Sequence, residues 1–134
     1  MSVIQSMDKK MPILIVDDFA TMRKIVKKAL KDLGFENVTE AEDGAIALSK
    51  LDGGNFSFII SDWNMPNMMG IDLLKAVRGN EQTKTIPFLM ITAEAQKDNL
   101  VEAAKAGVSN YMMKPFTSES LQQKIEAIFA KKNT

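Results

Sequence analysis

Five residues that could share one chemical task directly follow, or close, short apolar segments of the chain. Asp17 and Asp18 follow the segment MPILIV, Asp62 follows FIIS, Thr92 closes FLMIT, and Lys114 follows SNYMM. Three carboxylates that meet repel one another, and a hard divalent cation is the simplest relief of that repulsion. Because all the ligands are oxygen atoms, the pattern favours Mg²⁺ over zinc, with Mn²⁺ as an alternative.

The same residues could carry phosphoryl chemistry. An aspartate can act as a nucleophile and form an aspartyl phosphate while a metal ion, an ammonium group and a hydroxyl bind the phosphoryl oxygens. Asp62 is central in the pattern and suits the nucleophile, whereas Asp17 and Asp18 suit the metal. Each acid taken singly is more often explained by helix capping or a turn. Capping does not require all of them at the ends of successive strands, so the shared position favours a site.

Composition excludes several other kinds of chemistry. The 134 residues include no His and no Cys, which rules out Ser-His-Asp and Cys-His catalysis, thiolate zinc sites and disulfides. Without histidine the chain cannot carry phosphohistidine, so in phosphoryl transfer between proteins it can only receive. With 17 basic and 17 acidic residues, nothing in the charge favours nucleic acid or a membrane as partner. No segment resembles a signal peptide or a membrane span, so we expect a cytoplasmic protein.

Five short apolar segments alternate with five amphipathic ones. The predicted strands are 11–16, 38–41, 58–61, 88–92 and 109–113, and the predicted helices are about 22–33, 45–51, 71–77, 99–106 and 121–129. Gly34 suits the end of the first helix, and Thr117 or Ser118 the start of the last. This order predicts an α/β fold with a doubly wound, five-stranded parallel sheet. We expect one domain over 11–131, a short loose extension over 1–10 and a tail over 132–134.

Five sequence motifs resemble the response-regulator receiver domains of chemotaxis proteins: IVDDFATMRKIV, EAEDGAIAL, ISDWNMPNM, LMITAEA and YMMKPFT. The resemblance covers about Lys10 to Lys131 and implies a flavodoxin-like (βα)5 fold with strand order 2-1-3-4-5. By this resemblance Asp62 is the phosphorylated residue, and Asp17, Asp18, Asp62 and the carbonyl of Asn64 hold Mg²⁺. Thr92 and Lys114 then bind the phosphoryl oxygens, Tyr111 changes rotamer together with Thr92, and the Lys114–Pro115 bond is cis.

The resemblance also implies partners and a mode of action. They are a chemotaxis-type histidine kinase, a flagellar motor switch protein and a phosphatase. We expect a monomer that catalyses its own phosphorylation and dephosphorylation without turning over a separate substrate, and whose output is a protein contact. The residues expected to tune the phosphate lifetime are Phe19, Asn64 and Glu94, and the expected partner contacts are Ala95, Lys97, Leu100, Ala104, Tyr111, Met113 and Lys124. Ordinary loop positions for the first group, and helix core for Leu100 and Ala104, are the structural alternatives.

Three rival functions stay open at this stage. One keeps the receiver chemistry but serves another phosphorelay or acts as a phosphate sink. A second is a Mg²⁺-dependent aspartyl phosphatase, but its D-x-D-x-T pattern fails because Ala20 replaces the second acid. A third is a flavodoxin-like nucleotide binder, which the acids after the first strand disfavour because they repel phosphate.

Four further residues carry smaller expectations. Met69 replaces the polar residue usual in the family, so we expect a helix without its cap, at a cost of about 1 kcal/mol. Trp63, which is the only Trp, is expected to pack in the core beside the nucleophile and to report on it. Because side chains alternate along a strand, one of Met112 and Met113 should face outward.

Overall fold

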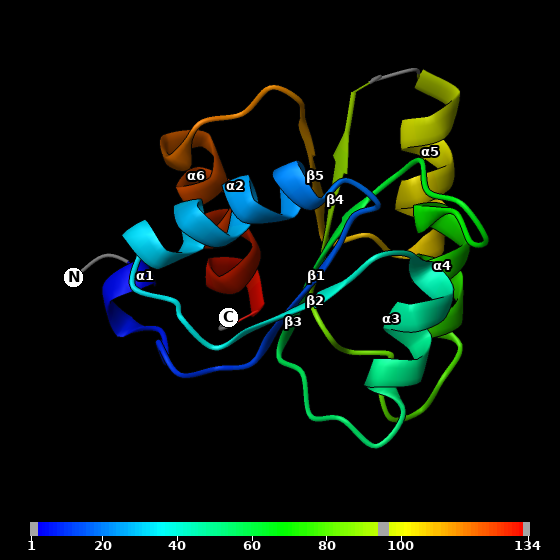
Figure 1. The fold of residues 1–134 in the computed structure, drawn as a ribbon, viewed down its shortest axis with the longest axis horizontal. Helices are drawn as coiled ribbons and strands as arrows, with labels where there is room; N and C mark the ends of the chain where they lie inside the picture. The colour runs from blue at the N-terminus through cyan, green and yellow to red at the C-terminus, as the bar shows by residue number, and fades with distance from the viewer. Residues whose placement is uncertain (1–2, 94–96, 133–134) are drawn as a thin grey trace.

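The computed structural model describes residues 3–93 and 97–132, and a single parallel sheet lies at its centre (Figure 1). Its strands are β1 (Ile13–Val16), β2 (Val38–Ala41), β3 (Phe58–Asp62), β4 (Phe88–Thr92) and β5 (Asn110–Met113), in the order β2-β1-β3-β4-β5. Every residue of β1, β3 and β4 is buried, which explains why their segments are continuously apolar instead of alternating. The predicted fold class and strand order are confirmed.

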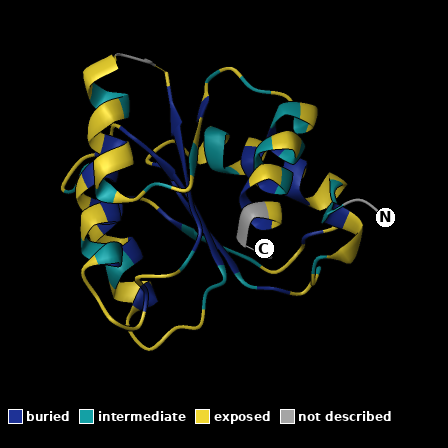
Figure 2. Cartoon of the chain, turned by 180° about the vertical axis from the view of Figure 1, so that it is seen from behind, coloured by how far each residue is buried: buried dark blue, intermediate teal, exposed yellow. Residues whose placement is uncertain are grey.

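In the described part of the chain, six helices cover the two faces of the sheet. They are α1 (Val3–Ser6), α2 (Ala20–Asp32), α3 (Gly44–Leu51), α4 (Gly70–Arg78), α5 (Lys97–Ala106) and α6 (Ser118–Lys132). Helices α1, α2 and α6 lie on one side and α3, α4 and α5 on the other (Figure 1). Successive side chains of β1 point to the two sides of the sheet in turn. Ile13 and Ile15 pack with the layer of α2 and α6. Leu14 and Val16 pack with the layer of α3 and α4. Figure 2 shows the buried sheet between helices whose outer faces are exposed.

Two predicted helix boundaries are confirmed in detail. Gly34 follows α2 with a φ of 102°, a left-handed conformation that glycine adopts without a Cβ penalty. At the start of α6, the Thr117 hydroxyl accepts from the Ser120 N–H at 3.0 Å, and the Ser120 hydroxyl accepts from the Thr117 N–H at 3.0 Å. This reciprocal pair satisfies two backbone donors at the point where the chain turns into the helix.

The expectation of a loose N-terminal extension is wrong for its described part. Residues Val3–Ser6 form α1, in which Ile4 is buried, and α1 packs against α6. Ile4 and Met7 are three positions apart and both contact the core cluster that includes α6. Helix α1 is too short to be stable alone, so its order comes from this tertiary burial, which sequence periodicity does not reveal. Within residues 3–93 and 97–132, no helix is long and apolar enough to cross a membrane.

Candidate functional site

Three carboxylates meet at the carboxyl end of the two central strands. Asp17 directly follows β1 and Asp62 ends β3, and the pairing of Val16 with Ser61 places the two acids side by side. One carboxylate oxygen from each of Asp17, Asp18 and Asp62 lies within 4.8 Å of the others. Asp17 and Asp62 are 3% and 7% exposed, whereas Asp18 is exposed, so the cluster has a buried floor and an open side.

The Lys114 ammonium faces this cluster. Its Nζ lies 3.1 Å from Asp62 Oδ1 and 3.4 Å from Asp17 Oδ2. Its backbone N–H donates to the Thr92 carbonyl at 2.8 Å, which fixes Lys114 to the end of β4, and the Lys114–Pro115 bond is cis as predicted. Thr92 itself is buried at the same end of the sheet. The structure therefore brings the predicted acids and the lysine into one site, with the threonine on the neighbouring strand end.

The surroundings of Asp62 raise the pKa of its carboxyl, and its hydrogen-bond partners offset this rise only in part. Burial raises the pKa of its carboxyl most, and the charge of Asp17 raises it further. The ammonium of Lys114 and the backbone N–H of Trp63, which donates to Asp62 Oδ1 at 2.8 Å, act in the opposite direction. The net pKa is raised, so the charged carboxylate is held in an environment that a bound cation would stabilise.

Two hydrogen bonds hold Asp17 in place. Its Oδ1 accepts from the Phe19 N–H at 2.9 Å, and its carbonyl accepts from Arg23 Nη1 at 2.8 Å. The Arg23 Nε also donates to Glu40 Oε1 at 3.0 Å, so the guanidinium links β1, β2 and α2. Arg23 was not predicted as a site residue, because no local sequence pattern indicates its contact with Glu40 on β2.

The loop between Asp62 and α4 approaches the site closely. The Gly70 N–H donates to the Trp63 carbonyl at 2.8 Å, which closes residues 63–70 into a compact loop. A Cβ on Gly70 would collide with the Asp62 carbonyl, so only glycine fits there. Asn64, whose carbonyl was the predicted fourth metal ligand, lies exposed in this loop, and Trp63 is buried as predicted.

As predicted, α4 begins without a side-chain cap. Met69 occupies the N-cap position, and its side chain makes no capping hydrogen bond. The first turn of α4 therefore depends on packing and on Asp72, an acid in that turn, for stabilisation.

The expected switch residue Tyr111 lies on the surface. Its side chain is 38% exposed, and Lys124 Nζ lies 5.4 Å from the centre of its ring. Met112 is buried and Met113 is 44% exposed, so the predicted alternation along β5 is confirmed. Lys97 and Ala104 are exposed and Leu100 is half-buried, so helix core does not explain Ala104. Glu94 and Ala95 lie outside the described residues.

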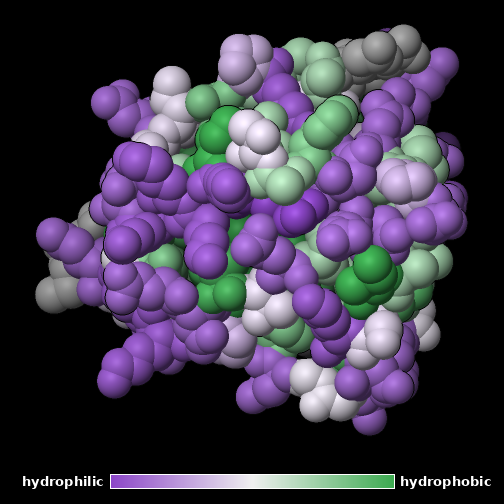
Figure 3. Space-filling model, in the orientation of Figure 1, coloured by the Kyte–Doolittle hydropathy of each residue, from purple (hydrophilic) through white to green (hydrophobic). Residues whose placement is uncertain are grey.

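An exposed apolar side chain also occurs away from β5 and α5. Phe19, 67% exposed, stands beside the acids at the start of α2. The face seen in Figure 3 is mainly hydrophilic, with apolar side chains in separate small patches.

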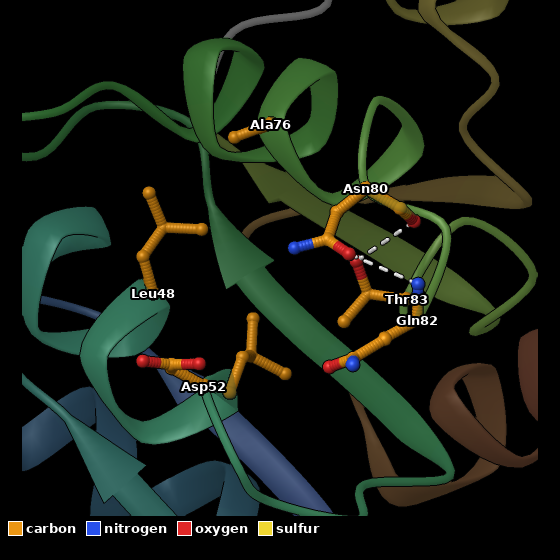
Figure 4. Close-up of a pocket in the computed structure, with 7 residues that line it drawn as sticks. Leu48, Asp52, Ala76, Asn80, Gln82 and Thr83 are labelled. Carbon is orange, nitrogen blue, oxygen red and sulfur yellow. Dashed lines mark hydrogen bonds between the residues drawn. The ribbon is translucent and has the colours of Figure 1, made fainter.

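A hollow elsewhere on the molecule differs from the acidic site. It has a volume of about 180 Å³ and lies between the end of α3 and the end of α4 (Figure 4). Leu48, Asp52, Asn80 and Thr83 line it, with the Thr83 N–H donating to the Asn80 carbonyl at 3.0 Å. Only one carboxylate, Asp52, borders it, so the charge concentration needed for a cation is present at the strand ends and not here.

The acidic cluster has the chemistry of a Mg²⁺ site. Its donors are carboxylate oxygens, one side is open to solvent, and Mg²⁺ commonly keeps several waters while binding one or two carboxylates. Ligand oxygens on opposite sides of Mg²⁺ are about 4.2 Å apart, so oxygens within 4.8 Å of one another can reach one ion with small side-chain movements. Asp17, Asp18 and Asp62 could therefore hold a divalent metal.

Comparison with known proteins agrees with this geometry. Residues 13–126 match the family model of the response regulator receiver domain. The chain belongs to the response regulator receiver domain family. This receiver domain is 58% identical to chemotaxis protein CheY of Pseudomonas aeruginosa over 123 residues, which cover 92% of the chain and 99% of that protein. It is 56% identical to chemotaxis protein CheY-3 of Vibrio cholerae, over 92% of the chain and 95% of that protein.

A solved structure supports the same assignment. Chemotaxis protein CheY4 of Vibrio cholerae superimposes on the receiver domain with a TM-score of 0.83 at 38% identity, covering 89% of this chain and 98% of that one. The predicted resemblance is thereby confirmed, and the receiver domain is homologous to chemotaxis response regulators over most of its length.

Proposed function

We propose that this receiver domain is a chemotaxis response regulator that accepts a phosphoryl group on Asp62 from a histidine kinase. The observation that carries the proposal is the contact of Lys114 Nζ with both Asp62 Oδ1 and Asp17 Oδ2, at 3.1 and 3.4 Å, beside the open acid Asp18. A nucleophilic carboxylate, a metal-binding acid pair and a fixed cation for phosphoryl oxygens then lie in one place.

In the proposed reaction an Asp62 carboxylate oxygen attacks the phosphorus of a phosphohistidine as the N–P bond breaks. The donor histidine leaves as imidazole and takes up a proton, and Asp62 becomes an aspartyl phosphate. Asp17, Asp18, Asp62 and the Asn64 carbonyl would hold Mg²⁺, which when bound would neutralise charge at the phosphoryl oxygens. The Lys114 ammonium and the Thr92 hydroxyl bind the other phosphoryl oxygens. Water later hydrolyses the phosphate, with no separate substrate turned over.

The output is proposed to be a change in affinity for a flagellar motor switch protein. Tyr111 and Met113 are exposed on β5, and Lys97 and Ala104 are exposed on α5, so apolar and polar groups are available on one edge of the sheet. A coupling of about 1–3 kcal/mol between phosphorylation and binding is sufficient for such a switch. We propose that the receiver unit spans 11–131 with α1 packed against it, acts in the cytoplasm as a monomer, and has its phosphate lifetime tuned at Phe19, Asn64 and Glu94.

The proposed function is tested with Trp63 as the reporter. Its side chain is 6% exposed, and its backbone N–H contacts the Asp62 carboxylate. Mg²⁺ should change its fluorescence, and beryllofluoride, which mimics a phosphoryl group, should change it further only when Mg²⁺ is present. An Asp62→Asn variant that keeps the second change would refute the phosphoacceptor role. The motor target is tested separately, by whether beryllofluoride tightens binding to an N-terminal peptide of the motor switch protein.

A further inference from the structure

A third buried acid at the carboxyl end of the sheet, besides Asp17 and Asp62, joins two loops. Asp43, 6% exposed, lies between β2 and α3. Its Oδ1 accepts from the Ile46 N–H at 2.9 Å and so caps α3, while its Oδ2 accepts from the Asn67 Nδ2 at 2.8 Å. Asn67 belongs to the loop that begins at the phosphoacceptor. One carboxylate therefore connects the start of α3 to the loop that contains the Asn64 carbonyl.

The residue at the other end of this bond has an unusual backbone conformation. Asn67 has a φ of 65°, and it is the only residue other than glycine with a positive φ in the described part of the chain. This conformation disfavours most side chains, although asparagine tolerates it better than others. Because it is not the preferred state of a free loop, the surrounding contacts must select it, and the bond to Asp43 is one of these.

A second contact between the same two loops points the same way. A Cβ on Gly44 would lie 2.8 Å from Met68 Cγ, so the Met68 side chain lies directly against the start of α3. Within the loop, the Met68 N–H donates to the Pro66 carbonyl at 2.7 Å, and the Gly70 N–H closes the loop onto the Trp63 carbonyl. The two ends of the loop, residues 63 and 70, are thus joined by a hydrogen bond, and its middle contacts the start of α3 at Asp43 and Gly44.

We propose that Asp43 is a positioning residue for the metal site, acting through Asn67 to hold residues 63–69 in the shape that presents the Asn64 carbonyl to the cation. This role rests on the proposed function, because it requires the metal to bind there. Asp43 is not a member of the acidic cluster, so its contribution comes through the loop and not through direct coordination. Groups that orient metal ligands commonly change metal affinity by about 10- to 100-fold when removed.

Two variants separate this role from simple capping of α3. Asp43→Ser keeps a side chain that caps helices well but is too short to also reach Asn67. Asn67→Gly leaves the cap on Ile46 intact, tolerates the positive φ and removes the same hydrogen bond from the other side. The matched control is Asp52→Ser, which removes an exposed acid from the opposite end of α3.

The first measurement is Mg²⁺ affinity from the fluorescence of Trp63. Both single variants should raise the Kd about tenfold, the double variant should be no weaker than either single one, and Asp52→Ser should match the wild type. Single variants within twofold of the wild type, or a double variant about a hundredfold weaker, would overturn the proposal. A wild-type protein with no Mg²⁺ response would overturn the proposed function, and this role with it.

The second measurement uses the metal-free protein, so it does not depend on metal binding. Amide hydrogen exchange at Met68 and Gly70 should become about tenfold faster in Asp43→Ser and in Asn67→Gly. Exchange at Ile59, whose N–H donates to the Pro87 carbonyl at the other end of the sheet, should not change. Unchanged exchange at Met68 and Gly70 would show that Asp43 only caps α3, and the positioning role would be wrong.

Discussion

The two ends of the sheet differ in how the charges of their ionisable side chains are compensated. At the amino end, the Arg78 guanidinium donates to the carbonyls of Gly107 at 2.9 Å, Ile86 at 2.6 Å and Lys84 at 3.1 Å. These bonds connect the end of α4 to the segments before β4 and β5. At the carboxyl end, the nearly buried acids Asp17 and Asp62 share one ammonium, and their charges remain in excess.

This difference indicates that Arg78 and its carbonyl partners are structural, whereas Asp17, Asp62 and Lys114 form a site for chemistry. Burial lowers the pKa of Arg78. Its N–H groups donate to neutral backbone carbonyls, so these contacts involve no repulsion between like charges. Burial and Asp17 raise the pKa of Asp62, and Lys114 only partly compensates. We infer that the amino end contributes stability, whereas the carboxyl end gives up stability to keep a cation and a phosphoryl group favourable there. The predictions below test this contrast from the largest effect to the smallest.

Asp62→Asn should abolish the beryllofluoride response and also stabilise the metal-free protein by about 1 kcal/mol at pH 7. Because its folded pKa is raised, the Asp62 carboxyl contributes stability below its unfolded pKa and loses that contribution as pH rises through the folded pKa. At pH 7 the charged group is therefore unfavourable, and the neutral amide removes the cost. Fluorescence and urea unfolding measure the two effects, with Asp52→Asn as the control. A variant less stable than the wild type would contradict the contrast.

Arg78→Met should lower the free energy of unfolding by roughly 3 kcal/mol, because three carbonyls lose a charged donor in a partly buried place. The Mg²⁺ response of Trp63 in the folded variant should be unchanged. Urea unfolding gives the first quantity and titration the second. The control is Lys84→Met, which removes an exposed lysine that pairs with Glu81 at 2.8 Å and should cost little. A weakened Mg²⁺ response at full stability would show that the two ends are not independent.

Lys114→Met should distinguish the role of the Lys114 ammonium from that of Mg²⁺ at the carboxyl end of the sheet. Beryllofluoride affinity should fall about 30-fold, since a charged hydrogen bond of about 2 kcal/mol is lost. Mg²⁺ affinity should rise slightly, because the ammonium no longer competes for Asp17 and Asp62. Lys75→Met, an exposed lysine on α4, serves as the control. If Mg²⁺ binds more weakly in Lys114→Met, the ammonium organises the acids instead of competing with the metal.

Much of this contrast could be predicted from the sequence. Asp17, Asp62 and Lys114 were identified because parallel strands end at one edge of the sheet, so residues after successive strands must meet. Their types then indicate the chemistry. The predicted order of strands and helices from β1 onward followed from periodicity and was confirmed, with boundaries differing by a few residues, whereas α1 was not predicted.

Other features depend on contacts that no local pattern contains. Arg78 and Arg23 occur as ordinary polar residues of amphipathic helices, and their partners lie on other elements. Arg78 donates to the Gly107 carbonyl before β5, and Arg23 donates to Glu40 on β2. The bond between Asp43 and Asn67 joins loops after β2 and β3, strands that are not neighbours in the sheet. The motif EAEDG contains Asp43 and could have directed attention to it, but only the fold shows what its second oxygen contacts.

The smallest expected effect compares Asp43 with Asp62, two buried acids at the same end of the sheet. Hydrogen bonds from the Ile46 N–H first, and from Asn67 next, lower the pKa of Asp43. A lowered folded pKa means that stability from this carboxylate is present above its unfolded pKa and is lost as pH falls through the folded pKa. The wild type should thus exceed Asp43→Ser by up to about 1 kcal/mol at pH 6, and this advantage should shrink below about pH 4.

Urea unfolding of the wild type and Asp43→Ser at pH 6, 5, 4 and 3 measures this difference directly. Protonation of Asp62 acts in the opposite direction, so the wild type also gains stability from that group as pH falls. Carrying Asp62→Asn in both proteins removes the opposing contribution and isolates Asp43. A difference that stays constant down to pH 3 in that background would mean that the bonds to Ile46 and Asn67 do not depend on the charge of Asp43. The contrast between Asp43, whose hydrogen bonds lower its pKa, and Asp62, whose burial raises its pKa, would then be wrong.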